Sequence, residues 1–156
     1  MDIRVFANRA VFILIIISLA LFAYFDYQRS KHFNSTIEAL HSLSPTDITS
    51  INVYFNESLG GEPKKLTSKV DIANFLSGLK ESKKKFGSHA RHNYHSSLII
   101  KPQQIYIRMS VPSNIPDHVY FYVGDFSANG GFTSYGSLYS SGLYPWFKEH
   151  VIGNGT

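Results

Sequence analysis

The chain has 156 residues, the usual size of one domain, and a formal net charge of +4 at pH 7. Because this basic excess is small, we do not expect nucleic acid as a partner. The chain has no cysteine, which excludes disulfide bonds, thiolate metal ligands and cysteine nucleophiles. Aromatic residues make up 15% of the chain, and their large areas favour a folded domain over a disordered tail.

An uncharged, strongly apolar segment occupies residues 10–25, with Ser18 as its one clearly polar residue. A membrane-spanning helix needs about 17–25 residues, so this segment is at the short end of that range. A basic side chain before it and tyrosines after it extend the span into the two interfaces. The sequence therefore predicts an N-terminal transmembrane helix that contacts the lipid bilayer through residues 10–25. Its expected anchor residues are Arg9, Ile13, Ile16, Leu19, Tyr24 and Tyr27.

The same segment has one alternative interpretation, a cleaved signal peptide. Cleavage sites carry small residues in an A-x-A arrangement, whereas Ala20 and Ala23 are three positions apart and have bulky aromatic neighbours. This pattern favours an uncleaved anchor. Basic residues are balanced on the two sides of the segment, so the positive-inside rule does not decide its orientation. The free amino terminus favours a cytoplasmic N-terminus, which predicts a single-pass protein of the plasma (inner) membrane with an extracytoplasmic domain.

After the anchor, apolar residues keep a helical spacing. Phe33, Ile37 and Leu40 fall at i, i+4 and i+7 with polar residues between them, which indicates a juxtamembrane helix ended by Pro45. Beyond it the apolar period changes from helical to two, which marks a different unit. We therefore divide the chain into a tail with its anchor, a helical stalk and a globular α+β domain, at residues 1–27, 28–45 and 46–156.

The first half of the domain is expected to hold one strand and one helix. Alternating apolar residues at 51–55 predict the strand, and the glycine-containing segment 56–63 predicts a turn. Ser68, with Asp71 three residues later, resembles a capping box. The apolar stripe that follows predicts an amphipathic helix that ends near residues 85–87.

The second half of the domain is expected to be mostly strands. Period-two patterns predict three strands and a short edge strand, at residues 97–101, 105–111, 119–123 and 132–134. Ser141 is then expected to cap a C-terminal helix that has Pro145 in its first turn. Because short connections favour antiparallel neighbours, the predicted fold class is α+β, a small antiparallel sheet of about 4–5 strands with two helices packed on one face.

Histidines at a regular spacing form the sharpest polar motif, H-x-x-H-x-x-H at His89, His92 and His95. Neutral imidazoles bind zinc or copper, and His118 would add a fourth ligand if its strand end lies nearby. The alternatives are an exposed polar loop and a pH-sensing cluster. Because Arg91 and an upstream lysine run oppose a cation, no cofactor is expected, and a zinc or copper site is kept as the alternative.

Aromatic residues form the candidate partner-binding surface. Tyr106, Tyr120 and Tyr122 alternate onto the outward face of the predicted sheet, and a glycine-rich loop at 124–136 adds further rings. Exposed aromatic stripes are typical of recognition surfaces, although a C-terminal helix would cover the same face equally well. The predicted partner-binding residues are Tyr106, Tyr120, Tyr122, Phe126, Phe132 and Tyr135.

Motifs for catalysis are scarce in this sequence. It contains neither a phosphate-binding loop nor a G-x-S-x-G nucleophile motif. We therefore expect a membrane-anchored, non-enzymatic module that binds a protein partner at the membrane, as an accessory subunit or an immunity-type inhibitor. A metal-binding protein that uses the histidine motif is the alternative, and a Ser–His hydrolase ranks last.

Overall fold

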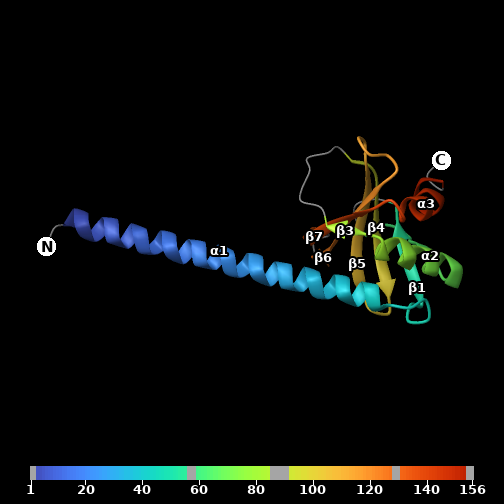
Figure 1. Cartoon of the computed structure of the whole chain (residues 1–156), viewed down its shortest axis with the longest axis horizontal. Helices are drawn as coiled ribbons and strands as arrows, with labels where there is room; N and C mark the ends of the chain where they lie inside the picture. The colour runs from blue at the N-terminus through green and yellow to red at the C-terminus, as the bar shows by residue number, and fades with distance from the viewer. Residues whose placement is uncertain (1–2, 56–58, 85–91, 128–130, 154–156) are drawn as a thin grey trace.

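The computed structural model describes residues 3–55, 59–84, 92–127 and 131–153, and for residues 3–10 it describes only the helical backbone. A single long helix leads from the N-terminus into an α+β domain (Figure 1). His89, Arg91 and the turn residues 56–58 lie outside the described residues.

The N-terminal helix α1 spans Ile3–Ser42 and has 40 residues. Every residue from 11 to 32 is exposed, including the large apolar side chains of the expected anchor. The structure thus confirms a helix that is long and apolar enough to span a membrane. The chain leaves the helix before Pro45, and Asp47 accepts hydrogen bonds from the Ser44 N–H and hydroxyl, at 2.8 Å each.

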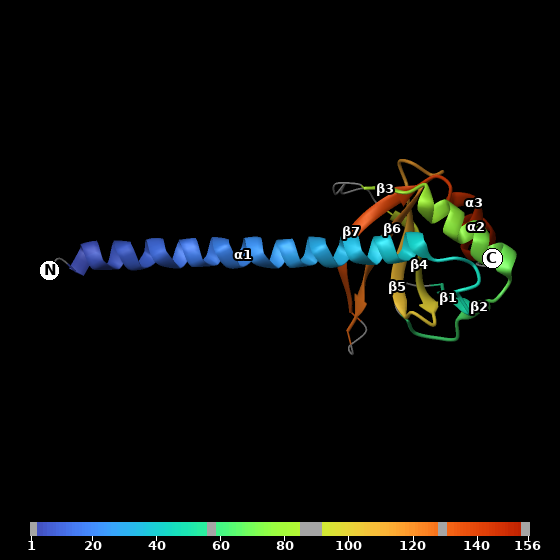
Figure 2. The ribbon, with the colours of Figure 1, turned by 60° about the horizontal axis from the view of Figure 1, so that its bottom comes forward.

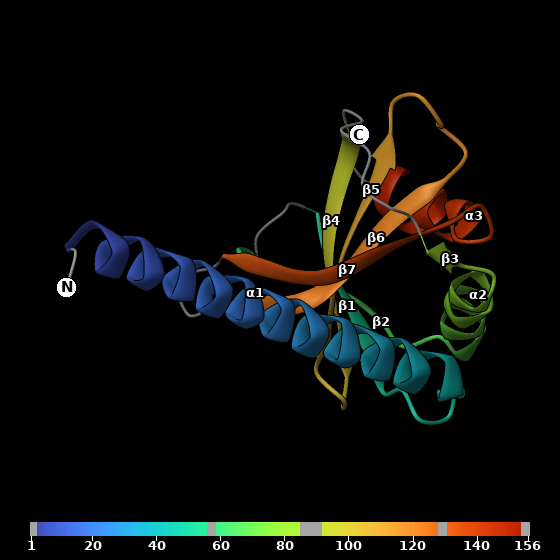
Figure 3. The same cartoon turned by 60° about the vertical axis from the view of Figure 1, so that its left-hand side comes forward.

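The described residues contain seven strands in one sheet, in the order β2-β1-β4-β5-β6-β7-β3 with antiparallel neighbours. The α+β class with an antiparallel sheet is confirmed, whereas the expected number of about 4–5 strands is wrong. Figure 3 shows β4 and β7 running in clearly different directions, so the sheet is strongly twisted. The strands are β1 (Ser50–Tyr54), β2 (Lys64–Leu66), β3 (Lys83–Lys84), β4 (His92–Lys101), β5 (Ile105–Pro112), β6 (Val119–Phe126) and β7 (Phe132–Ser140).

The strand residues that the sequence pattern does not predict lack a regular alternation of apolar and polar side chains, for physical reasons. β2 and β3 have only three and two residues, which are mostly lysine. β4 begins at His92 and not at Ser97. Its first residues show no regular alternation, because the strand is irregular at Tyr94, where φ is 53°. β7 is a full strand rather than a short edge strand, and its pairing with β6 shifts between Val123 and Gly124. Such bulges move side chains off a period of two.

The predicted amphipathic helix is present as α2 (Lys69–Lys80). Its start is confirmed, since the Ser68 hydroxyl accepts a hydrogen bond from the Asp71 N–H at 3.3 Å. It ends at residue 80, earlier than expected, because β3 begins at residue 83. The apolar stripe of this helix is buried and consists of Ile72, Phe75, Leu76 and Leu79.

The C-terminal helical segment does not begin at Ser141, and no side-chain hydrogen bond caps it. Instead, the buried hydroxyl of Ser140 forms hydrogen bonds with backbone groups at the junction between β7 and this segment. It accepts the Leu143 N–H at 3.2 Å and donates to the Gly78 carbonyl of α2 at 2.7 Å. The two elements that follow are α3 (Tyr144–Phe147) and a turn of π-helix, η1 (Lys148–Ile152).

One hydrophobic core joins all the helices to one face of the sheet. Phe33 and Leu40 of α1 are 6% and 1% exposed, and Phe75 of α2 and Phe147 of α3 are fully buried. The segment expected to be a stalk therefore contributes side chains to the core. In Figure 2 the C-terminal turns of α1 lie over the sheet beside α2, whereas the N-terminal turns extend away from the domain.

A close approach of two residues fixes α1 on the sheet. The ring of Phe33 lies directly over Gly136 of β7, where an added Cβ would come within 2.7 Å of the ring carbon Cδ2. Any side chain at residue 136 would push the ring away. The pairing of this phenylalanine with this glycine therefore sets where α1 crosses the strand.

Replacing Phe33 by alanine is expected to lower the free energy of unfolding by about 3–5 kcal/mol, because it leaves a cavity between helix and sheet. The measurement is urea unfolding of the full chain in mild detergent, followed by the fluorescence of Trp146, the only tryptophan. The control is Phe55→Ala, since Phe55 is 45% exposed. Equal losses in both variants would contradict the packing of α1 described above.

Candidate functional site

The sheet face opposite the helices carries a layer of aromatic side chains. On β5, Tyr106 and Arg108 point to this side because they alternate with Ile107 and Met109, which are fully buried in the core. On β6, residues 120 and 122 alternate with core residues in the same way. We call this surface the aromatic face, and its residues are His92, Tyr106, Arg108, Tyr120, Tyr122, Phe126, Phe132 and Tyr139.

Small residues between the rings let the rings lean over neighbouring strands. Ser110 is only 2% exposed, and its hydroxyl oxygen lies 3.0 Å from Nδ1 of His92. At Gly124, an added Cβ would lie 2.9 Å from Cζ of Phe132, so the phenyl ring covers this glycine. The aromatic face is thus a packed layer rather than a row of separate side chains.

Ring contacts in this layer join strands that are not neighbours in the sheet. The His92 ring of β4 lies 5.4 Å from Tyr120 and 6.3 Å from Tyr122 of β6, centroid to centroid. The guanidinium of Arg108 on β5 lies 4.7 Å from the ring centroid of Phe132 on β7. Edge-to-face ring pairs and cation–π contacts contribute about 0.5–1.5 kcal/mol each. These contacts hold the face in one arrangement and leave its outer ring surfaces accessible.

Five of the six predicted partner-binding residues lie on the aromatic face. Tyr106, Tyr122, Phe126 and Phe132 are half-buried, and burial raises the pKa of Tyr122 above its usual value. Tyr120 is only 3% exposed, so it supports the layer more than it offers contact area. The alternation also places Arg108 here, which sequence reasoning did not select although it shares a strand face with Tyr106.

Tyr135 lies on the helix side of the sheet, because the shift in pairing between β6 and β7 changes the direction of its side chain. Its ring packs edge-on against His32 of α1, with centroids 4.4 Å apart. Its hydroxyl donates a hydrogen bond to the Asp125 carboxylate. Burial and this hydrogen bond raise the pKa of Tyr135 to about 12.

Of the described histidines in the predicted metal set, two lie on β4 and one lies just before β6. His92 and His95 belong to β4, with ring centroids 6.4 Å apart, and Nδ1 of His92 faces the Ser110 hydroxyl. His118 lies before β6, and its Nδ1 is 2.8 Å from the Asp117 carboxylate. No group of three potential ligands occurs within the described ranges, which do not include His89. The metal site remains a prediction.

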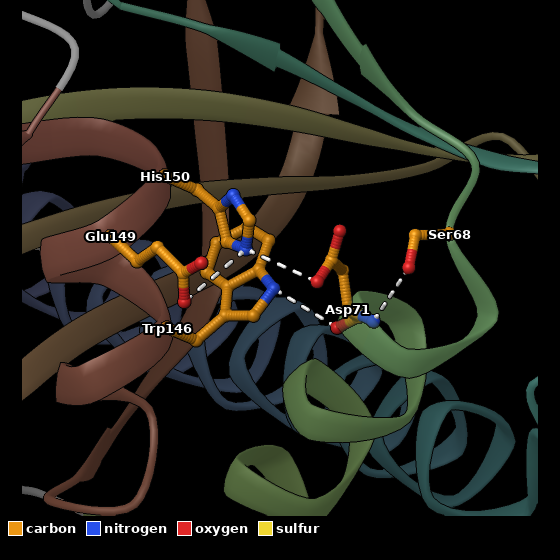
Figure 4. Close-up of polar contacts among 5 residues, drawn as sticks. All are labelled: Ser68, Asp71, Trp146, Glu149 and His150. Atoms are coloured by element: carbon orange, nitrogen blue, oxygen red, sulfur yellow. Dashed lines mark hydrogen bonds and ion pairs between the residues drawn. The ribbon is translucent and has the colours of Figure 1, made fainter.

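A second polar cluster, which the sequence did not indicate, lies where η1 meets the start of α2 (Figure 4). Nε2 of His150 lies 3.8 Å from the Asp71 carboxylate and 4.0 Å from that of Glu149. The indole N–H of Trp146 donates to the Asp71 backbone carbonyl at 3.0 Å. The Ser68 hydroxyl accepts from a backbone N–H, so the Ser, His and Asp side chains here form a helix cap and a packing contact rather than a hydrogen-bonded catalytic triad.

Burial dominates the electrostatics of this cluster. The His150 side chain is 7% exposed, and its burial lowers the pKa below the ordinary value of 6.5, which the nearby Asp71 only partly offsets. Lys64 also lowers the pKa, and Glu149 raises it. The neutral imidazole is therefore the form that packs against Trp146, with ring centroids 5.0 Å apart.

A groove between α1 and β7 is the third feature of interest. It has a volume of about 610 Å³ and follows residues 28–32 of α1. Nη2 of Arg29 donates a hydrogen bond to the Ser134 carbonyl at 2.6 Å, which links helix and strand at this point. The residues that line the groove are Gln28, Arg29, His32, Phe132, Thr133, Ser134 and Tyr135.

Comparison with known proteins adds no family to this description. No protein family matches the chain, and neither does any curated protein or solved structure with which it was compared. The functional argument therefore depends on the geometry of the chain itself.

The stability of the domain is expected to fall on acidification because of His150. Its pKa is lower in the folded state, so its contribution is fully present above about pH 6.5 and is lost as the pH falls through the folded pKa. The measurement compares urea midpoints at about pH 8 and about pH 5 by Trp146 fluorescence. His150→Gln should show a smaller drop than the wild type, while His41→Gln should keep the full drop. An identical drop in both variants would contradict this role.

Proposed function

We propose that this chain is a single-pass protein of the plasma (inner) membrane whose extracytoplasmic domain is a non-enzymatic protein-interaction module. In this proposal the aromatic face binds a membrane-associated protein partner, and the chain acts as an accessory subunit or an immunity-type inhibitor. α1 provides the membrane anchor.

The aromatic face is the observation that carries this proposal. Among the described elements, α1, α2 and α3 all place their buried side chains in the core on the other side of the sheet. The face combines half-buried Tyr106 and Tyr122 with Arg108, and tyrosine and arginine are the residue types enriched at interface hot spots. Because ring contacts already order these side chains, binding would cost little side-chain entropy.

The anchor supports the same proposal through geometry. The exposed apolar turns of α1 continue without a break into the turns that pack in the core. The domain would therefore sit directly on the membrane surface rather than at the end of a free stalk. A partner in the same membrane would meet the aromatic face at a restricted height and orientation, which raises its effective concentration.

Truncation of a tyrosine on the aromatic face is expected to weaken partner capture. We expect Tyr106→Ala to reduce the co-purifying partner about thirtyfold, the equivalent of a hot spot of about 2 kcal/mol. The measurement is quantitative mass spectrometry of proteins retained by the tagged full chain from its native membranes in mild detergent. The matched control is Tyr144→Ala, since Tyr144 is also half-buried but lies on the helix side. Undiminished capture by Tyr106→Ala would exclude the aromatic face as the interface.

The orientation can be tested directly because the chain has no cysteine of its own. The exposed Thr67 is changed to cysteine, and intact cells are treated with a membrane-impermeant maleimide. We expect full labelling without lysis, because the domain would lie outside the cytoplasm. Labelling that appears only after lysis would place the domain in the cytoplasm.

A further inference from the structure

The groove between α1 and β7 begins where the apolar part of α1 ends. Arg29 lies two residues after Tyr27 and four after Phe25. At a rise of about 1.5 Å per residue, Arg29 is about 3–6 Å and His32 about 8–11 Å beyond the apolar segment along the helix axis. The polar headgroup layer is about 5–7 Å thick on each side of the bilayer. The opening of the groove is therefore at headgroup depth, whichever way the helix crosses the membrane.

The strand side of the groove lies at the same depth. The Arg29 guanidinium is bonded to the Ser134 carbonyl at 2.6 Å, and the His32 ring contacts Tyr135 with centroids 4.4 Å apart. These two contacts bring residues 132–135 of β7 level with the first polar turns of α1. They make this part of β7 a membrane-proximal edge of the described domain (Figure 2).

The groove presents donors that suit a phosphate. A guanidinium has five N–H donors in a planar fork, and the contact with Ser134 engages only one nitrogen of Arg29, Nη2. Gln28, His32 and Thr133, whose side chains carry an amide, an imidazole and a hydroxyl, line the same space. An acidic side chain also contacts this region, since the Asp125 carboxylate accepts the Tyr135 hydroxyl.

An apolar wall completes the groove. The wall is the ring of Tyr135, which packs on the helix side, whereas Phe132 lines the groove from β7 with its ring on the aromatic face beside Arg108. A molecule with a phosphate followed by an aliphatic part would find a match for the donors and for this ring. A volume of about 610 Å³ lies within the range of about 300–1,000 Å³ that small-molecule sites occupy. Aromatic side chains are also favoured at the level of the lipid headgroups.

We infer that this groove binds the headgroup of an anionic phospholipid, with Arg29 as its phosphate contact. The inference rests on the anchoring part of the proposed function, but it does not depend on the aromatic face or on a protein partner. A bound headgroup would bridge α1 and β7 and so fix the height and rotation of the domain on the bilayer.

The test uses the full-length chain in an uncharged detergent and measures bound lipid by native mass spectrometry. Phosphatidylglycerol is titrated, with phosphatidylcholine and sodium phosphate as separate competitors. The test variant is Thr133→Glu, which places a negative charge in the groove at an exposed residue and leaves the contact of Arg29 with Ser134 in place. The matched control is Ser30→Glu, which adds the same charge at the same depth on a different side of α1.

We expect one phosphatidylglycerol molecule to bind per chain and to resist equimolar phosphatidylcholine and phosphate. Thr133→Glu should weaken this binding about fivefold, the effect of about one charge contact near a headgroup, whereas Ser30→Glu should change it less than about twofold. Equal effects of the two variants, or equal binding of the two lipids, would overturn the inference. Displacement by inorganic phosphate would identify a free-phosphate site and overturn the lipid assignment.

Alkaline carbonate extraction of native membranes tests the proposed anchor separately from the headgroup site. A chain that resists extraction but binds no lipid in the groove would disprove the headgroup site alone. A chain that is released by carbonate would disprove the anchor, and the headgroup site with it.

Discussion

The packing of the last turns of α1 on the sheet is the contact on which the rest of the structure depends. From residue 11 to residue 32 every residue of the helix is exposed, and from Phe33 to Leu40 the same helix contributes buried side chains to the core. Phe33 lies against Gly136 with no space for a side chain between them. One helix therefore serves as an apolar segment suited to the bilayer and as a component of the domain.

This continuity has consequences for both candidate sites. Because α1 does not leave the domain through a flexible linker, the height of the sheet above the apolar segment is set by the helix itself. The groove at Arg29 is formed by this arrangement, since one wall is α1 and the other is β7. The aromatic face lies on the opposite side of the same sheet from the core. Its direction relative to a membrane would follow from the contact between Phe33 and Gly136.

The parts of the fold that were predictable are those with a regular period. The stripe of α2 and the alternation on β5 and β6 each bury one face in the core, and that requirement is visible in the sequence. The apolar run of α1 is visible as well, although its side chains are exposed rather than buried in the domain. β2 and β3 are too short to show any period, and pairing with longer strands is what makes them strands. The start of β4 was hidden by the irregularity at Tyr94, and the length of β7 by the shift opposite Gly124.

In the candidate sites, too, only the features that follow a regular period were predictable from the sequence. Alternation placed Tyr106, Tyr120 and Tyr122 on one face, but the ring contacts of Tyr120 and Tyr122 with His92 cross a whole strand, and no local pattern reports such a contact. Tyr135 was assigned to the partner-binding set because the bulge that turns it toward α1 has no sequence signal. The groove needs two segments more than 100 positions apart, Arg29 and Ser134 being separated by 105.

The central claim is that the turns of α1 after the apolar segment belong to the folded domain. The most direct test compares two soluble truncated chains, one that starts at Gln28 and one that starts at Ser44, by urea unfolding followed through Trp146 fluorescence. We predict a single cooperative transition for the chain that starts at Gln28. The chain that starts at Ser44 should show no cooperative transition, because it lacks Phe33 and Leu40 and exposes the core beneath them. Equal stability of the two chains would contradict the account and make the helix a separate stalk.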